Sequence, residues 1–337
     1  KRYIYLPTEE DYLLIAIIIV HSYCVDLFDR TPYLWIQGEK GSGKTLLTQI
    51  LKGLVFNPFL VSETSAAALF RIIDTERPTL FLDEVEELQK RNASNQQIFQ
   101  IMNSGYQKDG CVTRVAKAEV LRFMTYGLKI IAGINPLMST LEDRCILQNM
   151  VKPPIEVKLE VFNTMDKSFA KVIVENIHSS LRRLRSNILQ ILINPSELEL
   201  SDCIRLREHD KWFPLLLLSK VLSGKESNYF ALLHKKALDY IDRKSLLEAQ
   251  LPEKMCESII RDFISDRSTE ALSQDKNHFL FPTVEIQKVI LANDVHNTYR
   301  NKSEITLTLK RIGIETDRRR FGNGPVSLYK IPKSILN

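Results

Sequence analysis

Between residues 33 and 134, short apolar segments alternate with longer stretches in which apolar residues recur every three or four positions. Short apolar segments are typical of buried strands, and the recurrent spacing is typical of helices that bury one face. Their alternation predicts an α/β fold, with a parallel sheet flanked by helices. The expected strands are 33–36, 59–61, 79–82 and 129–134, and the expected helices are 44–54, 66–73 and one that ends over 98–103.

Other patterns surround this alternation. Residues 112–115 and 120–123 are β-like and flank a short connection, which predicts a β-hairpin ahead of the last expected strand. After two consecutive prolines, residues 159–250 are nearly all helical in pattern and predict a helical lid. The apolar run 13–20 is far shorter than the roughly 18 residues of a membrane span, so we expect a buried helix there and no membrane segment.

The last part of the chain has a third organisation. We expect, in this order, a helix from 252 to about 272, a strand at 279–281, helices at 283–293 and 303–311, and two β-like runs around a Gly-Asn-Gly turn. Helices followed by a glycine-turned hairpin have the order of a winged helix, a DNA-binding variant of the helix-turn-helix. The expected division is a lead-in over 1–32, an α/β core over 33–152, a helical lid over 153–251 and a winged helix over 252–337.

Composition narrows the class of protein. The content of 44% hydrophobic and 26% charged residues is that of an ordinary globular chain. The five cysteines are scattered and fit neither a disulfide framework nor a zinc site, and no secretory leader opens the sequence, so we expect a reducing compartment. Residues 281–337 carry ten Lys or Arg against five Asp or Glu, which accounts for the whole net charge of +5. A basic tail on a neutral body indicates a local contact with a polyanion.

A glycine-rich segment between the first expected strand and the helix after it fits the pattern G-x-x-x-x-G-K-[S/T]. Its glycines let backbone N–H groups curl around phosphate oxygens, and the helix N-terminus adds the positive end of its dipole. The segment predicts an ATP site in which Lys44 reaches the β- and γ-phosphates and the Thr45 hydroxyl holds Mg²⁺. A chance glycine turn is the alternative, and the position between strand and helix argues against it. The expected nucleotide contacts are Gly38, Glu39, Lys40, Gly41, Ser42, Gly43, Lys44 and Thr45.

Asp83 and Glu84 close the third expected strand, at the carboxyl end of a parallel sheet, where the phosphate loop also lies. We expect Asp83 to bind Mg²⁺ and Glu84 to polarise the attacking water. Acidic residues after a strand also serve as helix caps, and that would be the better interpretation if the phosphate loop were absent.

Two further residues follow the last expected strand. Asn135 is placed to hydrogen-bond the γ-phosphate or the water, although an Asn-Pro pair is also a plain turn signal. Arg144 is a candidate arginine finger, which would project from the subunit edge into the nucleotide of a neighbour and neutralise charge in the transition state. A local pair of Arg144 with Asp143 or Glu142 is the alternative.

One joint pattern covers residues 38–45, 65–71, 78–84, 103–105, 140–144 and 207–215. In these segments the chain resembles the AAA+ P-loop, helicase-like domain of bacterial mobile elements and phages, which occurs beside primase modules and is related to superfamily 3 and minichromosome-maintenance helicases. This resemblance implies the AAA+ fold with lid and winged helix, and it implies that Arg207 is a second sensor that contacts the γ-phosphate from the lid. The segment 135–138 departs from the family, which more often has small residues there. Together with the reducing compartment that the cysteines indicate, the resemblance implies the cytoplasm of a bacterium or of a phage-infected host.

Two basic regions are candidate DNA contacts. Related hexameric helicases place a hairpin like the one expected over 112–123 in the central pore. A contact with DNA phosphates needs a cation on a part of the protein that can move. A solvated hairpin, a solvated arginine run and a winged helix that contacts protein are the alternatives. The candidates are Lys117 at the hairpin tip, Arg114 and Arg122 on its strands, Lys310 and Arg311 at the end of the expected recognition helix, and Arg318, Arg319 and Arg320 at the wing.

The function expected from the sequence is an ATP-dependent DNA motor, a hexameric replicative helicase of a phage or mobile element that translocates on single-stranded DNA. A primase or polymerase module in the same chain or complex is an expected partner. Two alternatives stay open: an AAA+ switch that loads or regulates another DNA enzyme or acts in phage defence, and a DNA-binding replication initiator whose assembly ATP controls.

Overall fold

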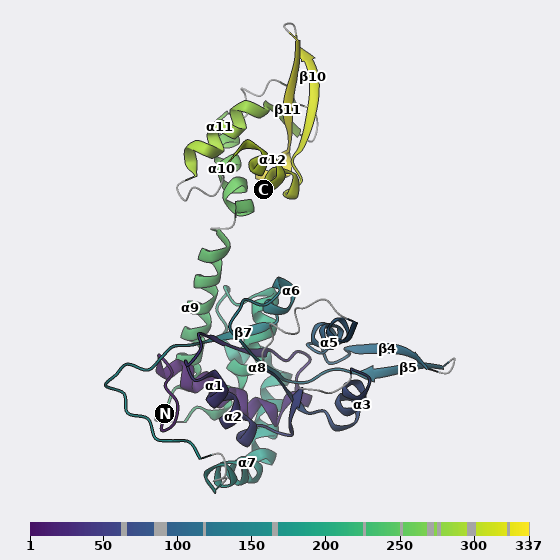
Figure 1. Ribbon diagram of the computed structural model, residues 1–337. Helices are drawn as coiled ribbons and strands as arrows, with labels where there is room; N and C mark the ends of the chain where they lie inside the picture. The colour runs from purple at the N-terminus through teal and green to yellow at the C-terminus, as the bar shows by residue number, and fades with distance from the viewer. Residues whose placement is uncertain are drawn as a thin grey trace. The chain divides into compact units, whose positions relative to one another are not determined.

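The computed structural model of the chain contains two compact units, Lys1–Ile241 and Asp242–Asn337 (Figure 1). The finer division expected within the first unit stays a prediction. The structure describes residues 1–61, 66–83, 93–116, 119–163, 168–224, 227–249, 252–267, 273–274, 278–294, 301–321 and 324–336.

A five-stranded parallel sheet is the centre of the first unit. Its spatial order is β2-β3-β6-β1-β7, and every pair of neighbouring strands is parallel. The strand β6 therefore lies between β1 and β3, although β3 and β6 are far apart in sequence. The strands are β1 (Tyr33–Gly38), β2 (Pro58–Val61), β3 (Thr79–Leu82), β6 (Lys129–Gly133) and β7 (Cys145–Met150).

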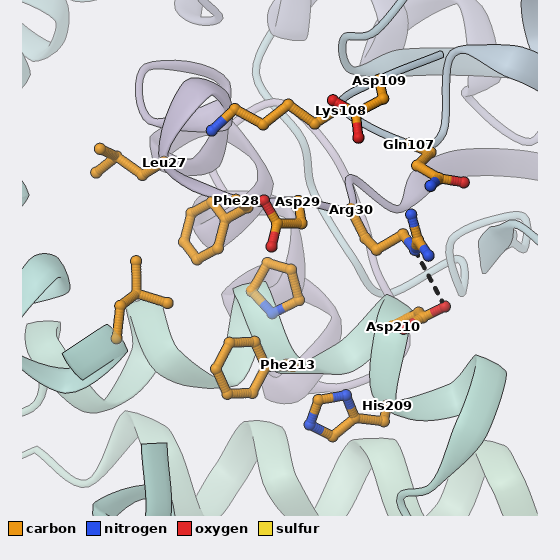
Figure 2. Close-up of a pocket in the computed structure, with 12 residues that line it drawn as sticks. Leu27, Phe28, Asp29, Arg30, Gln107, Lys108, Asp109, His209, Asp210 and Phe213 are labelled. Carbon is orange, nitrogen blue, oxygen red and sulfur yellow. Dashed lines mark hydrogen bonds and ion pairs between the residues drawn. The ribbon is translucent and has the colours of Figure 1, made fainter. Parts of the chain in front are cut away.

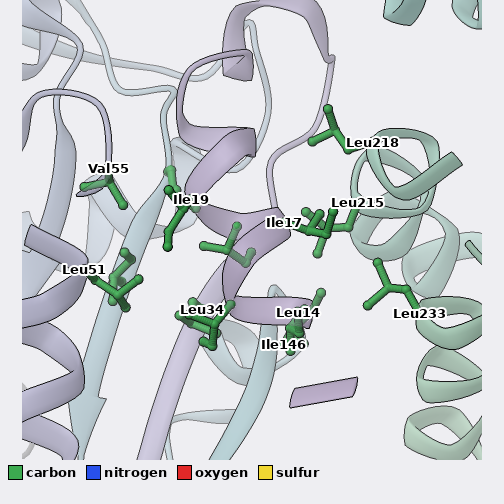
Figure 3. Close-up of a cluster of buried hydrophobic side chains, with 14 of the residues drawn as sticks. Leu14, Ile17, Ile19, Leu34, Leu51, Val55, Ile146, Leu215, Leu218 and Leu233 are labelled. Carbon is green, nitrogen blue, oxygen red and sulfur yellow. The ribbon is translucent and has the colours of Figure 1, made fainter. Parts of the chain in front are cut away.

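Helices cover both faces of this sheet because the inner strands are apolar on both sides. Leu34 and Ile36 of β1 belong to one buried cluster, and Tyr33 and Trp35 belong to another, as the alternation of side chains along a strand requires. Figure 3 shows the first cluster, to which Leu34 contributes together with side chains of α1, α2, α8 and β7. The described helices of the unit are α1 (Glu9–Ser22), α2 (Lys44–Leu54), α3 (Ala66–Glu76), α5 (Ala93–Ser104), α6 (Ser139–Glu142), α7 (Ser168–Ile193), α8 (Leu206–Leu222) and the part of α9 (Tyr229–Ala249) up to Ile241, with 3-10 turns η1 (Val25–Leu27) and η2 (Pro195–Leu198).

An antiparallel hairpin extends beside the sheet. Its strands are β4 (Cys111–Ala116) and β5 (Glu119–Met124), which lie against α5 and α3 respectively (Figure 1). The packed face carries apolar side chains, and Phe123 contacts Phe70 of α3 with ring centroids 6.0 Å apart. The hairpin is thus held from the side by two helices.

The second unit has its own buried cluster and a four-stranded antiparallel sheet of order β10-β11-β9-β8. Asn301 caps α12 because its side-chain oxygen accepts hydrogen bonds from the backbone N–H groups of Ser303 and Glu304, at 2.9 and 3.0 Å. The elements are α10 (Pro252–Arg267), β8 (Ser273–Gln274), β9 (His278–Pro282), α11 (Thr283–Asn293), α12 (Lys302–Arg311), β10 (Glu315–Phe321), β11 (Gly324–Pro332) and η4 (Lys333–Leu336).

The expected fold class is confirmed: the chain is an α/β protein with a parallel sheet between layers of helices. The strand β7 was missing from the expectation, because Gln148 and Asn149 interrupt its apolar pattern. Gln148 is nevertheless buried at the edge of the sheet. None of the helices in the described part of the chain is long and apolar enough to cross a membrane.

One buried histidine links α1 to the loop before β1. His21 is fully buried, its Nε2 lies 2.9 Å from the hydroxyl oxygen of Thr31, and its ring packs against Phe28 with centroids 5.3 Å apart. Burial lowers the pKa of His21 to about 3. Because the unfolded chain binds a proton near pH 6.5 and the folded chain does not, folding stability is fully present above pH 6.5 and falls as the pH drops from 6.5 toward 3.

We expect His21→Gln, which cannot titrate, to reduce this acid sensitivity. Between pH 7.5 and 5.0 the wild type should lose about 2 kcal/mol more free energy of unfolding than the variant, since each pH unit below the ordinary value costs about 1.4 kcal/mol. Urea denaturation at the two pH values measures this difference. Equal losses in both proteins would contradict the assignment.

Candidate functional site

The segment 38–45 forms a tight loop between β1 and α2. Gly41 and Gly43 have φ angles of +81° and +93°, a left-handed conformation that favours glycine. A Cβ on Gly38 would lie 2.4 Å from the carbonyl oxygen of Met150 and 2.7 Å from the Ser42 hydroxyl, so β7 leaves room only for glycine. The sequence therefore produces a compact loop whose backbone continues directly into the first turn of a helix.

Lysine and hydroxyl side chains complete the loop. The Lys44 ammonium donates to the carbonyl oxygens of Gly38 and Glu39, at 2.6 and 2.8 Å, so it lies across the loop. The Ser42 hydroxyl is buried and has no hydrogen-bond partner among the described residues. Glu39, Lys40, Gly41 and Thr45 are exposed. Such a loop offers N–H groups, one ammonium and a hydroxyl to an incoming phosphate.

The strand order brings two other predicted residues to the same edge of the sheet. The side chain of Gln37 donates to the carbonyl oxygen of Ile134 at 3.2 Å, which ties the segment after β6 to the end of β1. Asn135 follows there, and exposed Asp83 follows β3 on the other side of β6. The segment with Asn135 thus lies between the phosphate loop and Asp83. Glu84 lies outside the described residues.

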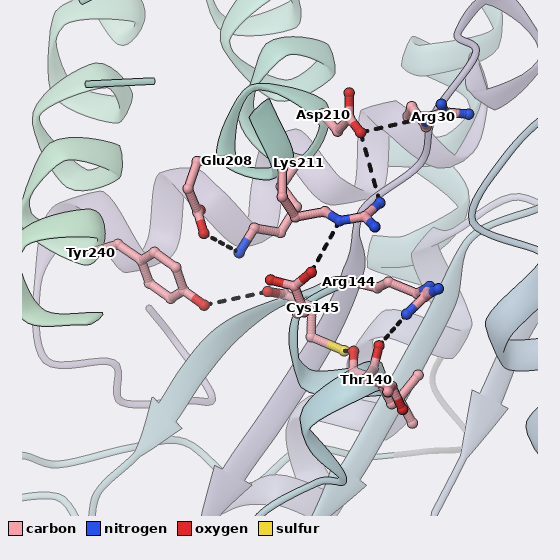
Figure 4. Close-up of polar contacts among 11 residues, drawn as sticks. Arg30, Thr140, Arg144, Cys145, Glu208, Asp210, Lys211 and Tyr240 are labelled. Atoms are coloured by element: carbon pink, nitrogen blue, oxygen red, sulfur yellow. Dashed lines mark hydrogen bonds and ion pairs between the residues drawn. The ribbon is translucent and has the colours of Figure 1, made fainter. Parts of the chain in front are cut away.

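Arg144 lies at the opposite end of the strands, where the amino ends of the parallel strands meet. It directly precedes β7, and its carbonyl oxygen accepts a hydrogen bond from the N–H of Tyr33, at the start of β1, at 3.0 Å. Six strand residues span about 20 Å, so Arg144 is at the far end of β1 from the loop of its own chain. Its guanidinium donates to the Thr140 carbonyl, and its buried Nε has no partner among the described residues (Figure 4).

Arg207 lies at this same amino edge, in the first turn of α8. Its Nε donates to the Asp143 carboxylate at 3.0 Å, its guanidinium also faces Asp210 at 3.7 Å, and it stacks 5.3 Å from the centre of the Tyr106 ring. This placement differs from a contact between the lid and the γ-phosphate of the same chain. The expected contact of Arg207 with a γ-phosphate stays a prediction.

The residues around the two arginines were not found by sequence reasoning. Tyr240 of α9 donates to the carbonyl oxygen of Cys145 at 3.3 Å, and buried Lys211 pairs with Glu208 at 2.9 Å (Figure 4). Burial raises the pKa of the Tyr240 hydroxyl, so it stays protonated as a donor. The start of β7 is therefore tied to α9 by Tyr240, and the residues just before it are tied to α8 by the Arg207–Asp143 pair. The helical periodicity of these two helices indicates buried faces but not which strand they meet.

Cavities open at this amino edge as well. One of about 440 Å³ lies beside the Arg30–Asp210 pair, whose nitrogen and oxygen are 3.4 Å apart, and the stacked rings of His209 and Phe213 line it (Figure 2). Another, of about 660 Å³, lies near the base of the hairpin and is lined by Tyr126 and other residues. No sequence motif pointed to either cavity.

The hairpin presents only part of its predicted basic surface. Arg114 is on the packed face, where it donates to the Gln100 side chain at 3.0 Å and stacks 4.7 Å from the centre of the Phe70 ring. Arg122 is exposed on the other face, opposite Thr113. Lys117 lies outside the described residues. Of the two strand arginines, Arg122 is thus the one available to a ligand.

In the second unit, some of the candidate DNA contacts pair with carboxylates of their own chain and others do not. Arg311 donates to Glu253 at 3.1 Å, and Arg319 pairs with Asp317 at 3.0 Å. Lys310 is exposed at the end of α12 and has no side-chain partner among the described residues. Arg318 is exposed on β10, and Arg320 follows in the same strand opposite Pro325.

Comparison with known proteins adds the following findings. No protein-family model matches the chain, and no curated protein matches it. Among solved structures, the chain is similar to the active helicase Cch of SCCmec type IV, with 12% identity and a TM-score of 0.43 over 96% of this chain and 68% of that chain. The NrS-1 C-terminal region is 10% identical, with a TM-score of 0.41 over 98% of this chain and 78% of that chain. JCV helicase is 14% identical, with a TM-score of 0.28 over 71% of this chain and 61% of that chain.

We expect Gly38→Ala to weaken binding of a fluorescent ATP analogue at least about tenfold, because the new Cβ would meet the Met150 carbonyl and Ser42 at less than contact distance. The control is Gly53→Ala inside α2, where the Cβ would make an ordinary contact of 3.6 Å with Ala170. Alanine should stabilise that helix by about 0.5–1 kcal/mol and leave binding intact. Equal affinities of the two variants would exclude this loop as the nucleotide site.

Proposed function

We propose that the chain is an ATP-dependent DNA motor, a hexameric replicative helicase of a phage or mobile element that translocates on single-stranded DNA. One observation carries the proposal. The phosphate loop lies at the carboxyl end of the parallel strands, whereas Arg144 and Arg207 lie at their amino end. A subunit with its phosphate site on one edge and its cationic residues on the other completes a nucleotide site only by stacking against a copy of itself. Repetition of that contact around an axis closes a ring.

In each site one subunit would supply the nucleotide-binding residues. Lys44 would exchange its two loop carbonyls for the β- and γ-phosphate oxygens, and Asn135 would orient the γ-phosphate or the water. The Thr45 hydroxyl and the Asp83 carboxylate are exposed oxygen ligands of the kind that Mg²⁺ takes together with phosphates. Bound Mg²⁺ would neutralise charge on the phosphates. Glu84 would accept the proton of the attacking water.

The neighbouring subunit would supply Arg144 and Arg207. The Arg207 and Asp143 side chains are 39% and 40% exposed, and ion pairs at that exposure contribute only about 0–1 kcal/mol. A triphosphate carries more charge than one carboxylate and would compete well for the guanidinium. Arg144 has a buried Nε that its own chain leaves without a partner among the described residues. Both groups would then neutralise charge in the transition state.

The DNA contacts would come from the hairpin and the second unit. Arg122 on the exposed face and Lys117, which the sequence predicts at the tip, would follow the phosphates of a single strand. In the second unit, helices are followed by an antiparallel hairpin, the order expected of a winged helix, which supports the proposal that Lys310 and the β10 arginines contact duplex at a fork. ATP-stimulated DNA binding without strand displacement would instead indicate a loading or regulatory switch.

Mixed assemblies test the contribution of each edge. Lys44→Ala mixed with Arg144→Ala, or with Arg207→Ala, should recover part of the ATPase activity, because some interfaces then join an intact phosphate loop to intact arginines. Lys44→Ala mixed with Asp83→Asn is the matched control, since both lesions lie at the same edge and no site is restored. ATPase assays on the mixtures, with co-assembly verified by native mass spectrometry, measure the recovery. Recovery in the control, or none in the arginine mixtures, would contradict catalysis in trans.

Salt titrations of duplex binding test the second unit. Lys310→Ala should lower the slope of log affinity against log salt by about 0.9, the value for one phosphate contact on duplex. Arg311→Ala should lower it less, because Glu253 already pairs with that guanidinium. If Lys310→Ala leaves the affinity and the slope unchanged, α12 does not face DNA.

A further inference from the structure

A buried lysine occupies the base of the hairpin. Lys129 is the first residue of β6, and its side chain is completely buried. Its ammonium donates to three backbone carbonyl oxygens, those of Gly105 at 3.1 Å, Thr125 at 2.7 Å and Gly127 at 2.8 Å. It also lies 5.1 Å from the centre of the Tyr33 ring. Three acceptors match the three N–H donors of an ammonium, so the site is built for this group.

The environment makes Lys129 unusual. Lysine is rarely buried without a carboxylate partner, and Lys129 has none among the described residues. Burial lowers its pKa well below the ordinary value, while the three carbonyl dipoles stabilise the charged form. The close approach depends on Gly105, where a Cβ would lie 2.2 Å from the Lys129 nitrogen. The chain therefore accommodates a costly burial where an apolar side chain would be cheaper.

The carbonyls that Lys129 joins belong to different segments. Gly105 follows α5, whereas Thr125 and Gly127 lie between β5 and β6. Thr125 extends the connection, because its N–H and its hydroxyl both donate to the Gly110 carbonyl ahead of β4, at 2.9 and 3.0 Å. The Thr125 hydroxyl also lies 2.8 Å from that of Ser104. These hydrogen bonds form one network at the base of the hairpin, which we call the hairpin foot. It joins both ends of the hairpin, the end of α5 and the start of β6, and Lys129 completes it.

We propose that Lys129 is a positioning residue that makes the hairpin foot one rigid body with the central sheet, so that movement of the nucleotide-binding core is transmitted to the hairpin tip. The proposal rests on the proposed motor function. Strand β6 has Lys129 at one end and leads to Asn135 at the other, and it is hydrogen-bonded on both sides within the sheet. A hairpin strand of six residues is about 20 Å long, so a slack of about 10° at the foot would shift the tip by about 3.5 Å, close to one nucleotide step.

A purely structural role makes a different prediction. If Lys129 only stabilised the fold, its loss would lower the fraction of folded protein, and ATP hydrolysis and unwinding would fall in the same proportion. A positioning role instead lowers the number of base pairs opened per ATP hydrolysed. The ratio of the two rates therefore separates the two roles.

The experiment compares the full-length wild type, Lys129→Met and the control Lys52→Met, whose lysine lies on α2, 5.6 Å from the centre of the Phe81 ring. ATPase activity without DNA, ATPase activity with single-stranded DNA and unwinding of forked DNA are measured for each. Lys129→Met should keep its DNA-free ATPase activity within about twofold and lose at least about fivefold in base pairs opened per ATP. Lys52→Met should match the wild type. Hydrogen exchange of residues 111–116 and 119–127 should be faster in Lys129→Met, with β1 unchanged.

An unchanged ratio in folded Lys129→Met, or equal losses of ATPase activity and unwinding, overturns the proposal. If Lys129→Met does not fold at the assay temperature, Thr125→Val decides, because it removes the two hydroxyl contacts of the foot and keeps the backbone. A ratio as in the wild type would then overturn it. A wild type that neither unwinds nor responds to DNA contradicts the proposed function itself, whereas a wild type that unwinds no better per ATP than Lys129→Met contradicts only the role of Lys129.

Discussion

The pairing of β6 with β1 on one side and β3 on the other is the constraint on which the arrangement of the site depends. It brings the segment after β6, which carries Asn135, between the phosphate loop and Asp83. Parallel pairing also places the starts of all strands at one end of the sheet. Arg144, directly before β7, and Lys129, the first residue of β6, therefore lie at the end opposite the loop 38–45. An antiparallel strand in this position would mix the two sets of residues. The separation of the loop 38–45 from Arg144 and Arg207 is thus a consequence of sheet topology.

The edge opposite the loop is organised by polar contacts of limited strength. The Arg207–Asp143 and Arg30–Asp210 pairs are partly exposed, so they orient side chains more than they stabilise the fold. The buried contacts there, Lys129 with its three carbonyls and Tyr240 with Cys145, hold backbone instead. In the proposed assembly, a firm backbone with exchangeable side-chain pairs would suit a surface that meets the phosphates bound by another subunit. In the proposed motor, the same backbone would carry the hairpin.

Local sequence patterns predicted much of the fold. The helix over 44–54, the strand over 79–82 and the helix over 283–293 have the expected bounds, and the hairpin strands extend one residue further at each end than expected. The residues of the expected phosphate loop are adjacent in the sequence. A sequence motif was therefore enough to predict the loop. Glu84 and Lys117 lie outside the described residues, so their roles stay predictions.

What the sequence could not supply is the pairing of distant segments. Nothing in the local sequence shows whether an arginine of the expected lid lies near the phosphate loop or at the opposite end of the strands. Asp143, which pairs with Arg207, is 64 positions away in the sequence. Lys129 begins an apolar strand and resembles an ordinary solvated strand end, because its acceptors are backbone carbonyls that leave no side-chain pattern. Strand β7 was missed for a related reason: its polar residues are accommodated by tertiary packing.

Strand displacement on forked DNA, followed in real time beside phosphate release, tests the central claim most directly. The account predicts that the wild type separates the strands with ATP and Mg²⁺ and not with a non-hydrolysable analogue, and that Glu84→Gln binds ATP without hydrolysing it or opening the fork. ATP hydrolysis stimulated by DNA with no strand separation under any of these conditions would contradict a motor that unwinds DNA.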